Sequence, residues 1–295
     1  MSDFRLKVFQ SVAKNLSFTK ASQELFVSQP AITKHIQEVE ATYQTRLFDR
    51  QGSKISLTES GRLLLEHCER ILEEYKRLEY EMHLLHNEYI GELKLGASTT
   101  IAQYVLPPLL GSFIGKFPQV NLSLLNGNSR EIEAALQEHR IDLGLVEGVF
   151  RLPNLKYTTF LEDQLVAVVH SKSRLQLPEE ITPQDLPAIP LVLRERGSGT
   201  LDVIERSLQK HGVKLSSLHV LMYLGSTESI KLFLENSDCM GIVSIRSICK
   251  ELAAGTFRVV EIKDMPMLRD FCFVQLQGQE GGLSQAFMNY MFMSR

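Results

Sequence analysis

Hydroxyl-bearing side chains gather in two glycine-containing segments, each placed between an apolar run and a predicted helix. The first segment reads GASTT (96–100) and the second reads RERGSGT (194–200). Hydroxyl groups and free backbone N–H groups at the start of a helix favour an anion or another polar group, and glycine lets a ligand approach the backbone closely. The two segments therefore predict a site for a small polar molecule. The alternative for each hydroxyl is an ordinary helix cap.

The sequence gives no comparable support for an enzyme. Neither Gly-x-Ser-x-Gly nor a Walker loop occurs, and Gly197-Ser198-Gly199 lacks the spacing of a nucleophile elbow. The histidines form no metal-ligand pattern, and the cysteines at 68, 239, 249 and 272 form no CxxC pair. We therefore expect no catalytic residues, no cofactor and no metal. Binding of a phosphorylated substrate in the glycine-rich turns is the remaining enzyme reading.

A second set of polar residues opens a predicted helix near the N-terminus. Ser28 is a good N-cap, and Pro30 falls in the first turn, where its missing N–H is tolerated. An apolar stripe follows at helical spacing, namely Ile32, Ile36, Val39 and Tyr43. A shorter helix, capped by Ser17, precedes it across a tight turn. The two helices form a helix-turn-helix pattern.

The next two elements are a hairpin and a long helix. Residues 46–58 alternate apolar and polar side chains around a Gln-Gly turn, which predicts a short β-hairpin. From about 58 to 89, apolar residues recur at alternating spacings of four and three, as in a coiled-coil seam that needs a partner helix. The seam consists of Leu64, Cys68, Ile71, Tyr75, Leu78, Met82 and Leu85. The alternative is an amphipathic helix lying on its own domain.

The remainder of the chain, 90–295, alternates apolar strands with helices, for example at 131–139 and 201–210. This alternation predicts a mostly parallel sheet covered on both faces and divided between two subdomains, with crossovers near 162–164 and 266–269. The strand candidates are 92–98, 121–127, 141–148, 165–170, 189–193, 219–225, 240–245, 257–262 and 271–276.

Length and composition agree with a multidomain globular protein. The chain has 295 residues, of which 44% are hydrophobic and 23% charged, and its net charge is −3. Residues 1–58 carry eight basic and five acidic side chains, so this part alone is weakly positive. Neither a signal peptide nor a stretch long enough to span a membrane is evident, so we expect a cytoplasmic protein with no membrane partner.

Residues 17–61 resemble the DNA-binding signature of LysR-type transcriptional regulators. The matching residues are Phe18, Ala21, Ser28, Gln29, Pro30, Ala31, Ile36, Glu40, Leu47, Phe48, Arg50, Leu57, Thr58 and Gly61. The order of the later segments agrees, so the resemblance covers essentially the whole chain. It implies an α/β protein with an N-terminal all-α winged helix-turn-helix (1–58), a linker and dimerisation helix (59–89) and an effector-binding domain (90–295). The effector-binding domain is of the periplasmic-binding-protein type II-like kind, with subdomain I at about 90–163 and 268–295 and subdomain II at about 164–267.

The resemblance implies binding of double-stranded promoter DNA by the helix that starts at Ser28, inserted in the major groove. Gln29 suits an adenine edge and Lys34 suits guanine or phosphate, while the hairpin meets backbone or minor groove. For Ala31, core packing is the competing role. The expected DNA-contacting residues are Ser28, Gln29, Pro30, Ala31, Thr33, Lys34, His35, Arg50, Ser53 and Lys54, with Gln37 a further candidate.

The resemblance also implies that a small-molecule effector binds between the two subdomains and that the chain assembles as a dimer and a tetramer. The effector is either a small anion or organic acid, or an amine- or hydroxyl-bearing metabolite. The carboxylate of Glu147 disfavours an anion unless Arg196 pairs with it. The RERGSGT segment is similar to that of a subgroup linked to sulfur or carbon assimilation. A solute-binding protein for transport is a rival that residues 1–58 disfavour. The expected effector-binding residues are Ser98, Thr99, Thr100, Glu147, Arg196, Ser198, Gly199, Thr200 and Thr227.

Overall fold

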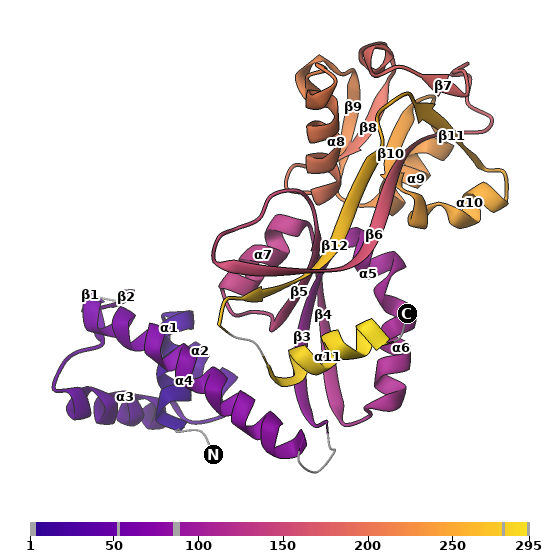
Figure 1. Cartoon of the computed structure of the whole chain (residues 1–295). Coiled ribbons are helices and arrows are strands. Elements are labelled where there is room, and N and C mark those ends of the chain that lie inside the picture. Colours follow the sequence, from indigo (N-terminus) through magenta and orange to yellow (C-terminus); the bar gives the residue numbers. More distant parts are fainter. Residues whose placement is uncertain (1–3, 52–53, 85–88, 279–280, 294–295) are drawn as a thin grey trace. The chain divides into compact units, whose positions relative to one another are not determined.

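The computed structural model describes residues 4–51, 54–84, 89–278 and 281–293 of the chain (Figure 1). The chain divides into two compact units, residues 1–88 and residues 89–295. Each unit has hydrophobic clusters of its own. Among the described residues, none of the helices combines the length and the apolar character needed to cross a membrane.

The first unit consists of four helices and a hairpin. Its elements are α1 (Phe4–Asn15), α2 (Phe18–Glu24), α3 (Gln29–Tyr43), β1 (Phe48–Gln51), β2 (Lys54–Leu57) and α4 (Glu59–Leu84). Ser17 caps α2 by accepting a hydrogen bond from the backbone N–H of Lys20 at 3.2 Å. One buried cluster, which includes Phe9, Phe18 and Ile32, joins the helices to Phe48 of the hairpin. The predicted helix-turn-helix and hairpin are therefore confirmed.

The predicted seam along α4 is wrong at its N-terminal end. Cys68 is fully buried in the core of the first unit, and its thiol donates to the backbone carbonyl oxygen of Leu6 at 3.2 Å. Leu64 and Leu72 pack against the same core. Positions 64, 68 and 72 recur every four residues, so they form a stripe facing the unit's own core. Leu85 lies outside the described residues.

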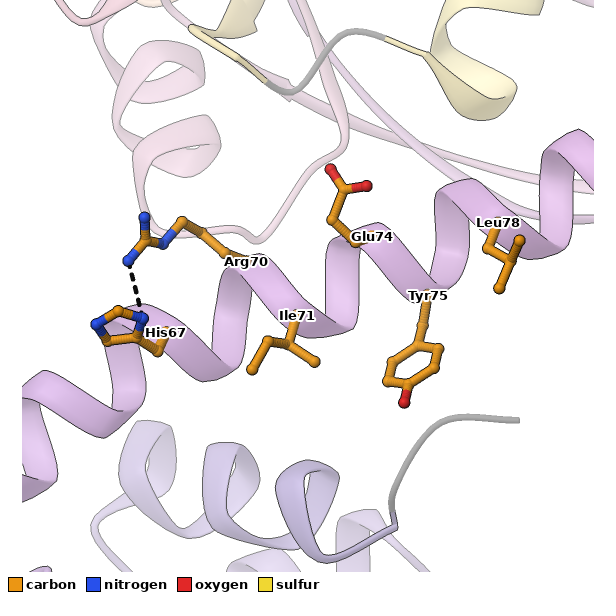
Figure 2. A pocket seen from close by; sticks show the side chains of 6 residues that line it. All are labelled: His67, Arg70, Ile71, Glu74, Tyr75 and Leu78. Atoms are coloured by element: carbon orange, nitrogen blue, oxygen red, sulfur yellow. Dashed lines mark hydrogen bonds between the residues drawn. The ribbon is translucent and has the colours of Figure 1, made fainter.

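A second apolar stripe of α4 is exposed. Leu63, Ile71, Leu78 and Met82 are between 42% and 59% exposed. Figure 2 shows part of this surface, a groove of about 540 Å³ in which Ile71, Tyr75 and Leu78 lie along one side of the helix. The first part of α4 thus packs on the core of the unit, while apolar residues further along the helix stay exposed.

The second unit contains a ten-stranded mixed sheet in the order β4-β3-β5-β12-β6-β10-β8-β9, with β11 and β7 off this path. The strands are β3 (Gly91–Ser98), β4 (Val120–Gly127), β5 (Leu143–Glu147), β6 (Leu155–His170), β7 (Glu180–Ile181), β8 (Leu191–Arg194), β9 (Val220–Leu224), β10 (Met240–Ser244), β11 (Phe257–Ile262) and β12 (Met267–Leu276). All nine predicted strands are present, whereas β7 and the first half of β6 were not predicted.

The sheet is mixed where a mostly parallel one was expected, because β6 and β12 run antiparallel to each other and to their other neighbours, β5, β10 and β11. Within β4-β3-β5 and within β10-β8-β9 the strands are parallel. Strand β12 pairs over its whole length with residues 155–165 of β6 (Figure 1). Between about 162 and 164 of β6, and between 268 and 270 of β12, each strand pairs only with the other. These residues overlap the predicted crossovers at 162–164 and 266–269, and the subdomain boundaries drawn there stay a prediction.

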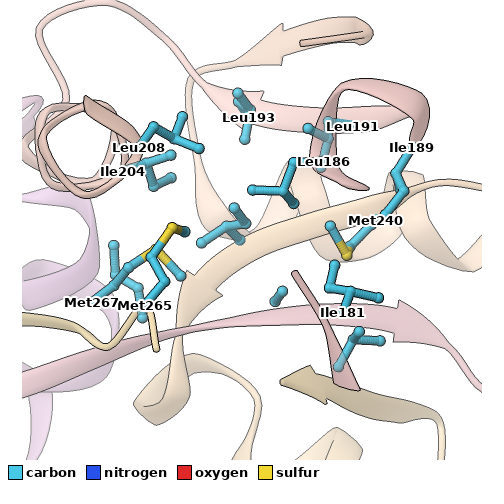
Figure 3. Close-up of a cluster of buried hydrophobic side chains, with 14 of the residues drawn as sticks. Ile181, Leu186, Ile189, Leu191, Leu193, Ile204, Leu208, Met240, Met265 and Met267 are labelled. Carbon is cyan, nitrogen blue, oxygen red and sulfur yellow. The ribbon is translucent and has the colours of Figure 1, made fainter. Parts of the chain in front are cut away.

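Helices cover the sheet and enclose buried hydrophobic clusters, of which the two largest are taken as the cores of the unit. The helices are α5 (Thr99–Tyr104), α6 (Leu106–Lys116), α7 (Ser129–Gln137), α8 (Gly199–Lys210), α9 (Thr227–Glu235), α10 (Cys249–Ala253) and α11 (Gly282–Met293). One core joins β3 and β5 to α5, α6 and α11. The other joins β8 and β10 to α8, where Ile204 and Leu208 face Leu191 and Leu193 (Figure 3). The carboxyl ends of the parallel strands carry the loops that hold the polar residues below.

Candidate functional site

The first candidate site is the exposed start of α3. Ser28 is the N-cap residue, yet its side chain makes no capping hydrogen bond, so the exposed hydroxyl is available to a partner. Gln29, Pro30 and Lys34 are exposed as well. The opposite face of the helix is anchored by the buried side chains of Ile32, Ile36 and Val39. The core therefore fixes which side of α3 points outward.

Other predicted DNA-contacting residues differ in their surroundings. Ala31 is half-buried, and the half-buried Thr33 donates its hydroxyl to the backbone carbonyl oxygen of Gln29 at 3.1 Å. His35 packs its ring edge-on against Phe4, with a centroid distance of 5.4 Å, so its side chain is directed partly toward α1. Arg50 lies in β1 and Lys54 in β2, and Ser53 lies outside the described residues.

Sequence reasoning missed Phe26, which lies in the turn between α2 and α3. Its side chain is 94% exposed and its backbone has a φ of +55°. A bulky residue rarely adopts this left-handed conformation, and an aromatic side chain rarely stays so exposed without a partner. Phe26 immediately precedes Val27 and Ser28, so it belongs to the same surface as the start of α3.

The junction between the hairpin and α4 is held by Thr58 and Gly61, two of the signature residues. The Thr58 hydroxyl donates to the backbone carbonyl oxygen of Arg46 at 2.8 Å and accepts from the N–H of Gly61 at 2.9 Å. A Cβ atom on Gly61 would lie 2.2 Å from the backbone oxygen of Leu47. Because no side chain fits there, Gly61 lets the hairpin pack directly against the start of α4.

The second candidate site is a buried polar network in the second unit, centred on Arg269 of β12. Its guanidinium contacts the Asp163 carboxylate at 2.7 Å, the Glu147 carboxylate at 3.4 Å and the Thr200 hydroxyl at 2.8 Å. Ser98, at the end of β3, donates its hydroxyl to Glu147. The network thus links β3 and β5 to β12, β6 and the first turn of α8.

Close backbone approach brings the second glycine-containing segment against the end of β5. A Cβ atom on Gly199 would lie only 1.9 Å from the backbone oxygen of Glu147, so this position requires glycine. That oxygen also accepts the Ser129 hydroxyl at 2.8 Å. Ser198 caps α8 by accepting the backbone N–H of Thr200 at 3.2 Å. The capping role considered for Ser198 therefore holds, while Thr200 is engaged by Arg269.

Arg194, which sequence reasoning missed, is the other buried cation of this region. It is 1% exposed, and its guanidinium contacts the Thr99 hydroxyl and the Gly225 carbonyl oxygen, each at 3.3 Å. The Glu195 carboxylate accepts two further hydrogen bonds from the Arg194 guanidinium, at 2.8 and 3.0 Å. Nη1 of Arg194 is buried without a hydrogen-bond partner, and so is the hydroxyl of Thr100. An unmet buried donor is costly, so these atoms are suited to hold a ligand.

A neighbouring cluster joins α5 to α9. The Tyr104 hydroxyl donates to Glu228, and Lys231 contacts Glu228 at 2.9 Å and Glu251 at 2.6 Å. Burial and the hydrogen bond to Glu228 raise the pKa of Tyr104 above its usual value, although the nearby charge of Arg194 acts in the opposite direction. For Glu228, burial raises the pKa, but the hydrogen bonds from Tyr104 and Lys231 outweigh it and hold the pKa below its usual value.

The predicted effector residues are thus largely, though not wholly, brought together. Ser98, Glu147 and Thr200 share one network with Arg269, and Thr99 contacts Arg194. Thr227 is buried at the first position of α9. The pairing considered between Arg196 and Glu147 is wrong, because Glu147 pairs with Arg269 while Arg196 is exposed. Arg269 crosses a buried strand, where a charged residue breaks an apolar run, and no other sequence signal marks it. Arg194 opens the RERGSGT segment that the sequence singles out, although the expected effector residues leave it out.

Comparison with known proteins matches both units. Residues 4–62 match the family described as bacterial regulatory helix-turn-helix protein, lysR family, and residues 86–292 match the LysR substrate binding domain. The RuBisCO operon transcriptional regulator of Acidithiobacillus ferrooxidans is 30% identical over 289 residues, covering 98% of this chain and 92% of that protein.

Solved structures agree. The Synechocystis PCC6803 CcmR regulatory domain in complex with 2-PG is 28% identical to this chain, with a TM-score of 0.62. The match covers 69% of this chain and 97% of that domain. Full-length CbnR, solved with its target DNA, covers 100% of both chains with a TM-score of 0.61; at 22% identity it supports the fold alone.

The fold and these matches define a DNA-binding transcriptional regulator with a separate effector-binding domain. The chain belongs to the LysR family. The family resemblance, the fold class and the regulatory function predicted from the sequence are therefore confirmed, and the chain is a regulator rather than an enzyme.

Proposed function

We propose that this regulator acts at promoter DNA in the cytoplasm and is controlled by a small organic anion bound beside Arg194. The observation that carries the proposal is the buried guanidinium of Arg194, whose Nη1 has no partner while its Nη2 contacts the Thr99 hydroxyl. Glu195 already occupies the other edge of this guanidinium. An oxyanion would satisfy Nη1, and charge-assisted bonds of this kind are strong.

The bound anion would lie where the two glycine-containing segments meet. We expect Ser98, Thr99, Thr100, Ser198, Gly199, Thr200 and Thr227 to surround it, with Arg194 in place of Arg196 as its main cation. Subdomain boundaries at about 163/164 and 267/268 remain part of this proposal. That the related CcmR regulatory domain was solved with 2-PG supports a small-molecule effector. A ligand that prefers the closed arrangement of the subdomains shifts their population and thereby the DNA-bound geometry.

The effector proposal is tested by thermal unfolding of the full chain with inorganic phosphate, sulfate and a panel of small organic acids. At least one anion should raise the melting temperature of the wild type, and Arg194→Gln should abolish that increase. Arg140→Gln, which changes an exposed arginine paired with Glu138, is the matched control. If no anion stabilises the protein, or if Arg194→Gln leaves the response intact, the proposed site is refuted.

We further propose that the exposed start of α3 reads bases while the hairpin positions the protein on the phosphates. Gln29→Ala should weaken binding to the DNA upstream of the regulator's own gene more than binding to random DNA. Lys54→Ala should weaken both alike and reduce the salt dependence of binding. Titrations at several salt concentrations that gave the opposite pattern would exclude these roles.

Self-association through α4 is the third part of the proposal. The exposed stripe of Ile71, Leu78 and Met82 suits a second copy of the helix. The edge strands β4 and β9 expose apolar side chains too, including Leu124 and Tyr223, which suits a tetramer contact. In light scattering, Leu78→Asp should shift the protein toward monomer and Gln209→Asp should not. A wild type that is monomeric at all concentrations contradicts this part.

A further inference from the structure

The proposed anion site beside Arg194 is closed to solvent. Arg194 is 1% exposed, and its Nη1 is buried. Thr99 and Thr100, at the start of α5, are 5% and 1% exposed. A protein interior is packed too densely for a solute to pass between fixed side chains. An anion therefore reaches Nη1 only when the elements around Arg194 move apart.

Two of these elements, α5 and α9, belong to opposite halves of the sheet. One half is formed by β4, β3 and β5, and the other by β10, β8 and β9, with β12 and β6 between them. Ile101 and Ala102 of α5 pack in the core that contains β3 and β5. Ile230 and Leu234 of α9 pack against β8 and β10. A contact between α5 and α9 therefore joins the two halves directly.

Both ends of α5 are bound to the other half. At its first residue, the Thr99 hydroxyl contacts Arg194 of β8. At its last residue, the Tyr104 hydroxyl donates to the Glu228 carboxylate in the first turn of α9. Helix α5 has only six residues, so these two contacts together fix its orientation against the other half. Both contacts must break before α5 can move away from Arg194.

Glu228 is itself held in place by a buried cation. Lys231 is 7% exposed and contacts the carboxylates of Glu228 at 2.9 Å and Glu251 at 2.6 Å. It also donates to the backbone carbonyl oxygen of Ser247 at 3.0 Å, and its ammonium lies 5.6 Å from the centre of the Tyr104 ring. The acceptor for the Tyr104 hydroxyl is thus charged and positioned by its own half. Hydrogen bonds to such an acceptor are stronger than neutral ones.

We propose that the hydrogen bond between Tyr104 and Glu228 is the gate of the anion site. It breaks when α5 moves away from α9, which exposes Arg194, and it forms again when the two halves close. This role rests on the proposed anion site, although the opening itself needs no ligand. Tyr104 is therefore a positioning residue, which sets how often the site opens, whereas Arg194 holds what enters.

Opening is measured by the reactivity of a thiol placed inside the closed site. Thr100→Cys places it there, because Thr100 is buried and its hydroxyl has no partner, and Cys249→Ser removes the exposed native thiol. The full chain with both changes is labelled with methyl methanethiosulfonate and followed by mass spectrometry. Labelling through brief local opening tracks the population of the open state. Tyr104→Phe should accelerate labelling of the introduced thiol about tenfold, since it removes a hydrogen bond to a charged acceptor.

Tyr157→Phe is the matched control. The Tyr157 hydroxyl donates to the Glu133 carboxylate at 2.6 Å, but both residues lie in the half that contains β5. This variant should leave the labelling rate unchanged. Glu228→Ala should accelerate labelling as Tyr104→Phe does, and the two changes together should label no faster than Glu228→Ala alone, because they remove the same bond.

Three results would overturn the gate. The first is rapid labelling of the introduced thiol before Tyr104 is changed, because the site would then be open. The second is a labelling rate that Tyr104→Phe leaves unchanged or that Tyr157→Phe raises equally. The third is that the buried Cys272 becomes labelled at the same rate, because Tyr104 would then stabilise the whole unit. If no anion stabilises the protein while labelling responds as expected, the gate stands and only the ligand proposal fails.

Discussion

Replacing Arg269 by leucine should be among the most damaging single changes in the second unit. The substitution leaves Asp163 and Glu147 without their cation, although the side chains of both carboxylates are at most 2% exposed. Breaking a buried ion pair from one side costs about 3–5 kcal/mol. For a unit of this size, the melting temperature should fall by about 10 °C.

Differential scanning calorimetry of the full chain measures this change in the transition of the second unit. Arg140→Leu is the matched control, because Arg140 forms an ion pair with Glu138 at the surface and should cost about 1 kcal/mol or less. The double variant Arg269→Leu/Asp163→Asn should recover part of the loss, since one orphaned charge is removed. If Arg269→Leu is no more destabilising than Arg140→Leu, the network does not hold the unit together and the reasoning is refuted.

Three further predictions concern other parts of the chain. Gly61→Ala should destabilise the first unit by about 1–3 kcal/mol in urea unfolding, because the added Cβ meets a backbone oxygen at 2.2 Å; Gly111→Ala, which meets nothing, is the control. Burial raises the pKa of the Cys68 thiol to about 12, so near pH 8 only the exposed Cys249 should react rapidly with a thiol reagent; rapid reaction of a second thiol in the folded protein would contradict this. The pKa of Glu228 is lowered on folding, so its carboxylate stabilises the fold above its ordinary pKa, and this stability is lost as the pH falls through the lowered value. Glu228→Gln should therefore reduce the melting temperature near neutral pH and have little effect in strong acid. An equal reduction of the melting temperature at both pH values would exclude the linkage.

Sequence reasoning reaches the elements whose signals are local. Ser28 and Pro30 mark the start of α3 because a cap and a first-turn proline act within a few residues. The strands of the second unit are found because buried strands are continuous apolar runs. In the same way, Gly199 belongs to a glycine-containing segment, although the reason for glycine there is a carbonyl oxygen from β5, far away in the sequence.

Features that depend on distant partners could not be predicted. Cys68 fits a coiled-coil spacing as well as a core spacing, and only the packing of α1 against α4 decides between them. Arg269 looks like an ordinary charged residue in the sequence, whereas folding buries it among hydroxyls and carboxylates from other elements. Arg194 lies in a segment that the sequence marks, but its contact with Thr99 of α5 depends on the fold. The antiparallel course of β6 and β12 depends on pairing between residues more than a hundred positions apart.

The pairing of β6 with β12 has a mechanical consequence for the second unit. Between the two cores the sheet narrows to these two strands, and their register shifts at Phe271/Cys272, where β6 contains one additional residue. Two-stranded ribbons twist more than wide sheets, and a bulge increases the local twist. We therefore expect a rotation of one core against the other to be taken up as twisting of this ribbon.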